Sequence, residues 1–257
     1  MHPVLISLGF IKIHTYGLLI AMAFLLGFWL MAKQGQKEGI GNTQIIYDLG
    51  FYILLGAIVG SRLLYVAIEY RRYLDEPFKI FYIWEGGLVF YGGLIGALIL
   101  GGWYVKKQHL SFWQMADLAA PSLALGQSLG RLGCFSAGCC YGKLSTGWGV
   151  VFTHPESLAP LGVKLHPVQL YSSLADLSVF VILLALQQVK KFPGQLIAYY
   201  LIFYSLDRYL IEFWRGDERG GINLGQIVLS TSQFISIFMF IAGLGLLFWK
   251  GRDKGHA

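Results

Sequence analysis

The chain has 257 residues, of which 56% are hydrophobic and only 13% are charged. Soluble domains average about 25% charged residues and membrane barrels show alternating segments of about ten residues, so the long uncharged runs of this chain exclude both classes. The net charge of +6 falls mostly beside the apolar runs, and we therefore expect no nucleic acid partner. The sequence predicts an all-α polytopic membrane protein, with residues 1–257 forming a single integral-membrane domain.

Seven apolar segments are long enough to cross the hydrocarbon core of a bilayer, which takes about 20 helical residues. The first has no basic region before it and no small-residue cleavage site after it, so we expect a retained helix and not a signal peptide. We predict about seven transmembrane helices and a small extracytoplasmic loop region at residues 134–167. In chain order the segments are 13–32, 44–68, 88–105, 112–129, 168–186, 196–213 and 234–249.

Positive charges follow the first, third, fifth and seventh segments, whereas the loops on the other side mix both signs. By the positive-inside rule the positively charged side faces the cytoplasm. This predicts an outside N-terminus, a cytoplasmic C-terminus and an outside position for the loop region. The residues that carry these charges are Lys33, Lys37, Lys106, Lys107, Lys190, Lys191, Lys250, Arg252 and Lys254.

The first two segments place Tyr16 near the outer start of one helix and Arg62 in the outer half of the next. A cation at bilayer depth costs at least about 2.5–3.5 kcal/mol on insertion scales and normally faces a cavity and a partner. We favour a structural role for Arg62 over a role in an anion site. Its expected partner is an acid carried by a helix, such as Asp48, Asp117, Asp176 or Asp207.

The third segment begins in a stretch that is dense in glycine. Gly92 and Gly96 have the spacing of a packing face between helices, and this accounts for them without any site. The pair Gly92 and Gly93 also fits a helix start at which the backbone closely approaches a ligand. Tyr91, which precedes them, is either an aromatic of the membrane interface or a hydroxyl of a site.

Arg131 lies at the outer end of the fourth segment, after an uncharged run and shortly before Gly133. A guanidinium stays charged and forms bidentate bonds to phosphate. We therefore interpret Arg131 as a ligand for a buried anion. The structural alternative is that it caps carbonyl groups or pairs with Asp117 or Glu85.

Three cysteines follow, at Cys134, Cys139 and Cys140. Their spacing matches no strong zinc pattern. On an oxidising face two of them could form a disulfide and leave one over, but we favour packing of small side chains at a tight turn. A metal site formed with His154 or His166 is the remaining alternative, and we do not assign one from the sequence.

The fifth segment opens at Pro167, a residue typical of the first helical turn. His166 and Gln169 share one face, which lines a site or caps the helix. Arg208 lies in the outer half of the sixth segment, and Glu212 follows at a spacing that favours an ion pair. Five polar side chains from different helices converge on one depth of the outer leaflet, namely Tyr16, Arg62, Tyr91, Arg131 and Arg208.

Taken in order, these motifs resemble those of the prolipoprotein diacylglyceryl transferases. The resemblance runs from about residue 13 to residue 250. It rests on His14-x-Tyr16-Gly17, Gly60-x-Arg62, Trp84-Glu85-Gly86-Gly87, Tyr91-Gly92-Gly93-Leu94-Ile95-Gly96, Gly130-Arg131-x-Gly133, His166-Pro167-x-Gln169 and Arg208 with Glu212.

The resemblance implies a seven-span enzyme of the bacterial inner membrane that needs no cofactor. Such an enzyme moves the diacylglyceryl group of phosphatidylglycerol to the lipobox cysteine in the signal peptide of a prolipoprotein, forming a thioether and releasing glycerol-1-phosphate. The motif match implies catalytic roles for Arg131, Arg208 and Tyr91. It implies phosphatidylglycerol binding by Arg131, Tyr16, Gly92, Gly93, Gly133, His166 and Gln169.

The chain departs from this family pattern at four positions. Many members carry His at position 91, Asn at 134, Glu at 139 and Glu at 172, where this chain has Tyr91, Cys134, Cys139 and Ser172. A phenol is a poor general base at neutral pH, because its ordinary pKa is about 10. Either the base is dispensable and the arginines carry catalysis, which we favour, or the acceptor or the activity has changed.

Two other classes of protein compete with the enzyme. A lipid-binding protein or transporter could use the same arginines without chemistry, although the repeated halves typical of transporters are not recognisable in the sequence. An inert scaffold explains the glycines but leaves the arginines at membrane depth without a purpose.

Overall fold

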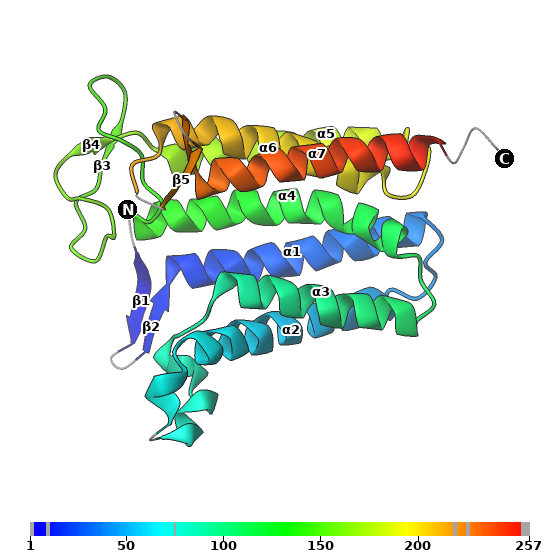
Figure 1. The fold of residues 1–257 in the computed structure, drawn as a ribbon, viewed down its shortest axis with the longest axis horizontal. Coiled ribbons are helices and arrows are strands. Elements are labelled where there is room, and N and C mark those ends of the chain that lie inside the picture. Colours follow the sequence, from blue (N-terminus) through cyan, green and yellow to red (C-terminus); the bar gives the residue numbers. More distant parts are fainter. Residues whose placement is uncertain (1–2, 9–10, 75, 218–219, 225–226, 253–257) are drawn as a thin grey trace. The chain divides into compact units, whose positions relative to one another are not determined.

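The computed structural model describes residues 3–8, 11–74, 76–217, 220–224 and 227–252, and Lys254 lies outside this range. The described chain is mostly helical (Figure 1). Its α helices are α1 (Thr15–Lys37), α2 (Gln44–Ile68), α3 (Phe90–Lys107), α4 (Phe112–Ala137), α5 (Val168–Gln187), α6 (Gln195–Ile211) and α7 (Thr231–Arg252). Its 3-10 helices are η1 (Tyr70–Tyr73), η2 (Pro77–Phe81), η3 (Ile83–Glu85) and η4 (Glu212–Trp214).

Within the described residues, three short antiparallel strand pairs accompany the helices. The hydropathy pattern did not predict them. They pair β1 (Val4–Leu8) with β2 (Ile11–His14), β3 (Val150–Val151) with β4 (Lys164–Leu165), and β5 (Gly221–Leu224) with β6 (Ile227–Ser230). The first and third hairpins lead directly into α1 and α7.

Four helices, α1, α2, α5 and α7, are long and apolar enough to cross a membrane by length and composition. The prediction of a helical membrane protein is confirmed at this level. The remaining helices α3, α4 and α6 coincide with the other three predicted segments, and the count of seven spans stays a prediction.

Helix α4 is longer than the apolar run that predicted it. It continues to Ala137, and Gly138 then adopts a positive φ of 76°, which is a common way for a helix to end. Arg131 and Cys134 therefore lie within the last two turns of a helix. Residues 134–137 are helical, and the loop begins only at Gly138.

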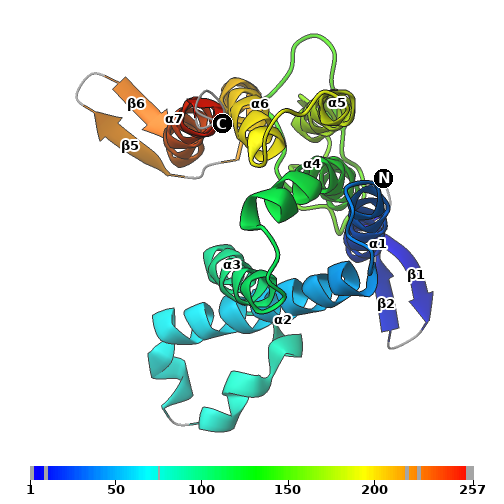
Figure 2. The ribbon, with the colours of Figure 1, turned by 90° about the vertical axis from the view of Figure 1, so that its right-hand side faces the viewer.

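The chain forms two compact units, one of residues 1–30 with 116–257 and one of residues 31–115. In the second unit α2 and α3 lie side by side (Figure 2). Gly56 and Gly60 of α2 face Gly96 and Gly92 of α3 so closely that a Cβ on any of them would overlap the opposite backbone. The predicted glycine packing face is confirmed.

Arg62 of α2 fixes the segment that links these two helices. It is 6% exposed and lies over the ring of Tyr65, 5.7 Å from the centroid. The structural role is confirmed, but the expected acid partner is wrong, because peptide carbonyls satisfy the guanidinium. It donates hydrogen bonds of 2.6–3.3 Å to the carbonyls of Lys79, Ile80, Gly86 and Gly87.

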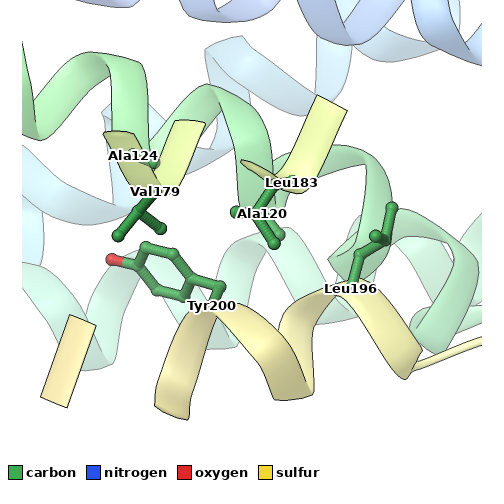
Figure 3. Packing of buried hydrophobic residues seen from close by; sticks show 6 residues of the cluster. All are labelled: Ala120, Ala124, Val179, Leu183, Leu196 and Tyr200. Carbon is green, nitrogen blue, oxygen red and sulfur yellow. The ribbon is translucent and has the colours of Figure 1, made fainter. Parts of the chain in front are cut away.

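In the first unit, the hydrophobic core lies between α4, α5 and α6 (Figure 3). Small residues on α4 let the neighbouring helices approach closely. Ser128 of α4 and Ser173 of α5 exchange hydrogen bonds to each other's carbonyls at 2.9 and 3.0 Å. The buried cluster consists of Ala120, Ala124, Val179, Leu183, Leu196 and Tyr200.

Asp117 of α4 caps the start of α6. Its carboxylate is fully buried and accepts hydrogen bonds from the backbone N–H groups of Gly194 at 2.8 Å and Ile197 at 3.0 Å. Lys190 lies 3.7 Å from the same carboxylate. The cap satisfies N–H groups that the first turn of a helix leaves without partners, so it fixes α6 against α4.

The loop after α4 folds back onto the end of α6. Gly142 donates a backbone hydrogen bond to His166 at 3.1 Å, and Lys143 donates one to Trp214 at 2.8 Å. Phe152 is almost fully buried and forms the centre of a small core under this loop. The loop therefore brings the C-terminal end of α4 and the residues that follow α6 to the same place.

Candidate functional site

Two of the predicted arginines belong to one electrostatic network in the first unit. Arg131 of α4 interacts with Tyr204 of α6 and Asp176 of α5. Arg208 of α6 interacts with Arg131 and Tyr204. Asp207 interacts with both arginines and with Asp176. Two cations and two acids of α4, α5 and α6 thus act electrostatically on one another.

The guanidinium of Arg208 is held by direct contacts. Its Nη1 lies 2.7 Å from Oε2 of Glu212, which confirms the predicted ion pair. Its Nη2 donates a hydrogen bond of 2.6 Å to Oγ of Ser232, at the start of α7. Because Arg208 is only 9% exposed, these contacts fix its charge in a largely desolvated position.

Arg131 differs from Arg208 in its contacts. Its interactions with Asp176 and Tyr204 are electrostatic only, and within the described ranges it makes no hydrogen bond to any acceptor. Its side chain is partly buried. A guanidinium has five N–H donors, and those of Arg131 are free to bind a ligand. This is the feature expected of an anion-binding group.

A third arginine, Arg215, extends the network, although it was not among the predicted site residues. It donates hydrogen bonds of 2.9 and 2.7 Å to the two carboxylate oxygens of Asp217. Burial alone would lower the pKa of Arg215, but the hydrogen bonds and charge of Asp217 outweigh burial and raise it. The sequence signal for this role is its position three residues after Glu212. Nε of Arg215 lies 3.6 Å from Oε2 of Glu212.

Tyr16 and Gly133 meet where α1 packs on α4. A Cβ at Gly133 would lie 2.9 Å from Cδ2 of Tyr16, so the glycine makes room for the ring. The ring of Tyr16 remains 43% exposed. Since Gly133 follows Arg131 by two residues, Tyr16 lies beside the turn of α4 that carries the arginine.

His166 and Gln169 organise the loop and also offer polar atoms. Nε2 of Gln169 donates a hydrogen bond of 2.8 Å to the carbonyl of Cys139. Its Oε1 is buried and has no hydrogen-bond partner among the residues that the structure describes. Nδ1 of His166 lies 3.3 Å from the hydroxyl of Tyr171. The free Oε1 can accept a hydrogen bond from a ligand.

The three cysteines lie together at the end of α4 and just after it, and no disulfide joins them within the part of the chain that the structure describes. The sulfur atoms of Cys134, Cys139 and Cys140 all lie within 4.8 Å of one another. Hydrogen bonding with Cys134 and Cys140, together with burial, raises the pKa of the Cys139 thiol. The cluster has the composition of a site for a thiophilic metal.

Tyr91, Gly92 and Gly93 belong to the second unit. Tyr91 follows the first residue of α3, is 52% exposed and makes an edge contact with Phe90. Gly92 and Gly93 are buried against α2, where a Cβ would meet the carbonyl of Gly60 or Oγ of Ser61. Contact with α2 accounts for the small size of both glycines.

The two acids that act on Arg131 and Arg208 differ in their partner from the sequence prediction. Asp176 and Asp207 were expected as partners for Arg62, whereas they interact with Arg131 and Arg208. A carboxylate within an apolar helix is a signal for a functional site. The sequence does not say which of several arginines each acid faces.

Comparison with known proteins identifies close relatives of the whole chain. A family model described as prolipoprotein diacylglyceryl transferase matches residues 3–249. A phosphatidylglycerol–prolipoprotein diacylglyceryl transferase from Clostridium tetani is 39% identical over 95% of this chain and 96% of its own length. Proteins of the same name from Halalkalibacterium halodurans and Geobacter sulfurreducens are 36% and 33% identical, over 99% and 98% of this chain and 88% and 96% of their own lengths.

Proposed function

The chain belongs to the prolipoprotein diacylglyceryl transferase family, and we propose that it transfers the diacylglyceryl group of phosphatidylglycerol to a cysteine thiol of a prolipoprotein. The acceptor is the lipobox cysteine at the end of the signal peptide. The reaction forms a thioether and releases glycerol-1-phosphate. The names of the relatives supply the donor and the acceptor. The observation that carries the chemistry is the guanidinium of Arg131, which lies in an apolar helix bundle and makes no hydrogen bond to any of the residues that the structure describes.

In the proposed mechanism Arg131 binds the phosphate of phosphatidylglycerol. A bidentate contact orients the phosphate, and the attacked carbon of the diacylglycerol is placed next to it. When the C–O bond breaks, the phosphate oxygen takes the electron pair and gains negative charge. A fixed cation in a water-poor site stabilises that charge in the transition state.

Arg208 supports this step with a second charge. Glu212 and Ser232 hold its guanidinium in place, so no reorganisation is needed when charge develops on the leaving phosphate. Asp176 and Asp207 act on the same two arginines. They limit the net positive charge of the site when it is empty.

The acceptor thiol attacks as a thiolate, since the thiolate is the nucleophilic form. Its sulfur forms the new bond to the glycerol carbon, and its proton leaves to solvent or to a base. Tyr91 is included because of its position in the family motif, and its hydroxyl is proposed to face the substrate. Gly92, Gly93, Tyr16, Gly133, His166 and Gln169 complete the proposed lipid site.

The site requires a defined orientation, because lipobox cysteines are exposed on the outer side of the cytoplasmic membrane. We propose that α1 to α7 all span the inner membrane of a bacterium, with the N-terminus outside and the C-terminus in the cytoplasm. One domain of residues 1–257 then carries the site at its outer end, next to the loop region of residues 134–167. The basic residues in the last turns of α3 and α7, Lys106, Lys107, Lys250 and Arg252, support this orientation.

Release of glycerol phosphate from phosphatidylglycerol tests the proposal. Purified protein in detergent is mixed with the lipid and a lipobox peptide. We expect Arg131→Ala to slow release by about 100- to 1,000-fold, as for the loss of one oxyanion donor. Arg252→Ala, which removes an exposed cation from the last turn of α7, is the matched control and keeps the wild-type rate.

Two results would contradict the proposal. One is an Arg131→Ala variant that is folded and as fast as Arg252→Ala. The other is a wild-type protein that binds phosphatidylglycerol but releases nothing in the presence of the peptide. The second result would assign the chain to lipid binding or transport on the same scaffold. Tyr91→Phe, measured in parallel, reports whether the phenolic hydroxyl takes part.

A further inference from the structure

The thiol cluster at the end of α4 has a geometry that the proposed mechanism does not use. Three sulfur atoms from Cys134, Cys139 and Cys140 lie within 4.8 Å of one another. Tetrahedral zinc, with Zn–S bonds of about 2.3 Å, needs sulfurs about 3.8 Å apart. Side-chain rotations that move the sulfurs by about 1 Å or less would therefore complete a three-sulfur site.

The backbone is shaped to bring these thiols together. Cys134 is on the last turn of α4, Gly138 ends the helix with a φ of 76°, and Cys140 has a φ of 57°. A positive φ is uncommon for a residue other than glycine. Gln169 fixes the turn from outside through its hydrogen bond to the carbonyl of Cys139.

Charge around the cluster suits a metal bound by three thiolates. Three thiolates and a divalent cation carry one net negative charge. Arg131 interacts with Cys134 and Cys140, and Arg215 interacts with Cys140. Cationic groups near the ligand sulfurs offset their charge, and groups that bond to ligands from the outer shell of a metal site also orient them.

The site has three ligands and not four. Among the described residues, no histidine or carboxylate joins the three sulfurs in the cluster. Zinc sites with four protein ligands are structural, whereas sites with three keep one position open for a water or a substrate. All three cysteines are partly exposed, so a substrate atom can reach the open position.

We propose that the three cysteines bind a zinc ion whose open position takes the acceptor thiol. This inference rests on the proposed function. The thiol loses its proton to solvent as it binds, since a coordinated thiol is deprotonated, and metal coordination activates it as a nucleophile. Its sulfur then attacks the glycerol carbon while the C–O bond to the phosphate breaks and the phosphate takes the electron pair. The product thioether is a neutral and weaker ligand, and it leaves the metal.

This arrangement accounts for three of the four departures from the family pattern. The chain has Cys134 and Cys139 where many members carry other residues, and it has Tyr91 where many carry a histidine. A metal that deprotonates the acceptor thiol removes the need for a general base at position 91. Arg131, one turn before Cys134 on the same helix, would hold the leaving phosphate next to the bound thiolate.

Metal binding is tested first, without reference to activity. Purified protein is stripped with a chelator and titrated with Co²⁺, whose thiolate complexes absorb in the near ultraviolet, and its zinc content is measured after exposure to Zn²⁺ and desalting. We expect one equivalent of metal. Cys139→Ser should lower the affinity by more than about 100-fold, the upper range for loss of an outer-shell group. Ser136→Ala, a neighbouring change on α4 that removes a hydroxyl hydrogen-bonded to the carbonyl of Leu132, should not lower the affinity.

The open position is tested with the acceptor peptide. A lipobox peptide should change the cobalt spectrum, and the same peptide with serine in place of cysteine should not. Zinc removal should slow glycerol phosphate release at least about tenfold, and zinc should restore it. Because these measurements use wild-type protein, a variant that fails to fold does not affect them.

The outcomes separate the two proposals. If the chain binds no metal, or if the stripped protein transfers at the full rate, the metal inference is wrong and the transferase stands. If metal and peptide bind as expected and no glycerol phosphate is released, the metal site stands and the transferase is wrong.

Discussion

Arginines inside the apolar helices of this chain have different surroundings, and these surroundings separate structural from functional cations. Arg62 gives its donors to four backbone carbonyls. Arg208 forms an ion pair with Glu212 and donates a hydrogen bond to Ser232. Arg131 has no such partner among the described residues. A buried cation normally has one, so an anionic ligand is expected to supply it.

The geometry of this contact makes a prediction for a conservative change. Arg131→Lys keeps the charge but loses the planar pair of donors, and a hydrogen bond to a charged group is worth about 1.5–3 kcal/mol. We expect transfer to be slowed about 10- to 100-fold, between the wild type and Arg131→Ala. The rate of transfer at saturating phosphatidylglycerol should fall more than the affinity for the lipid. Equal rates for the lysine and alanine variants would show that the charge alone has no role.

The pairing of helices depends on small residues at their contacts and on a buried carboxylate that caps a helix. The contact between α2 and α3 is made by glycines whose backbones touch. The contact between α4 and α6 is fixed by the Asp117 carboxylate, which caps α6. The Asp117 cap thus holds α4, which carries Arg131, against α6, which carries Arg208, within the first unit.

The glycine contact predicts a large effect from one methyl group. In Gly96→Ala the new Cβ would overlap the carbonyl oxygen of Gly56, and such overpacking costs about 1–3 kcal/mol. We expect a lower thermal unfolding temperature in detergent. Gly102→Ala, in the same helix with open space around it, is the control and should be neutral or stabilising by up to about 1 kcal/mol. Equal stability of the two variants would mean that α2 and α3 do not touch at Gly96.

At the scale of the molecule, the orientation in the membrane decides on which side the reaction occurs. A phosphatase that is active only outside the cytoplasm can be fused after Gln108 or after Thr146, in the connections that precede and follow α4. We expect activity for the fusion at Thr146 and none at Gln108, because lysines precede Gln108. The opposite pattern would place the Arg131 end of α4 in the cytoplasm and contradict the proposed reaction.

The sequence was informative where physical rules act locally. Hydropathy located all seven helices, because apolar length is a direct requirement for crossing a bilayer, and the spacing of Arg208 and Glu212 identified their ion pair. It could not give the partner of Arg62, the acids that face Arg131, or the meeting of three thiols. These depend on which helix faces match and on the backbone turn at Gly138 and Cys140, and neither is set by spacing along the chain.

The most direct measurement is the mass of a lipobox peptide after incubation with the purified protein and phosphatidylglycerol. We predict that the peptide gains one diacylglyceryl group on its cysteine sulfur, and that a peptide with serine at that position gains none. An unmodified cysteine peptide, recovered while the protein still binds the lipid, would contradict the assignment of this chain as a transferase.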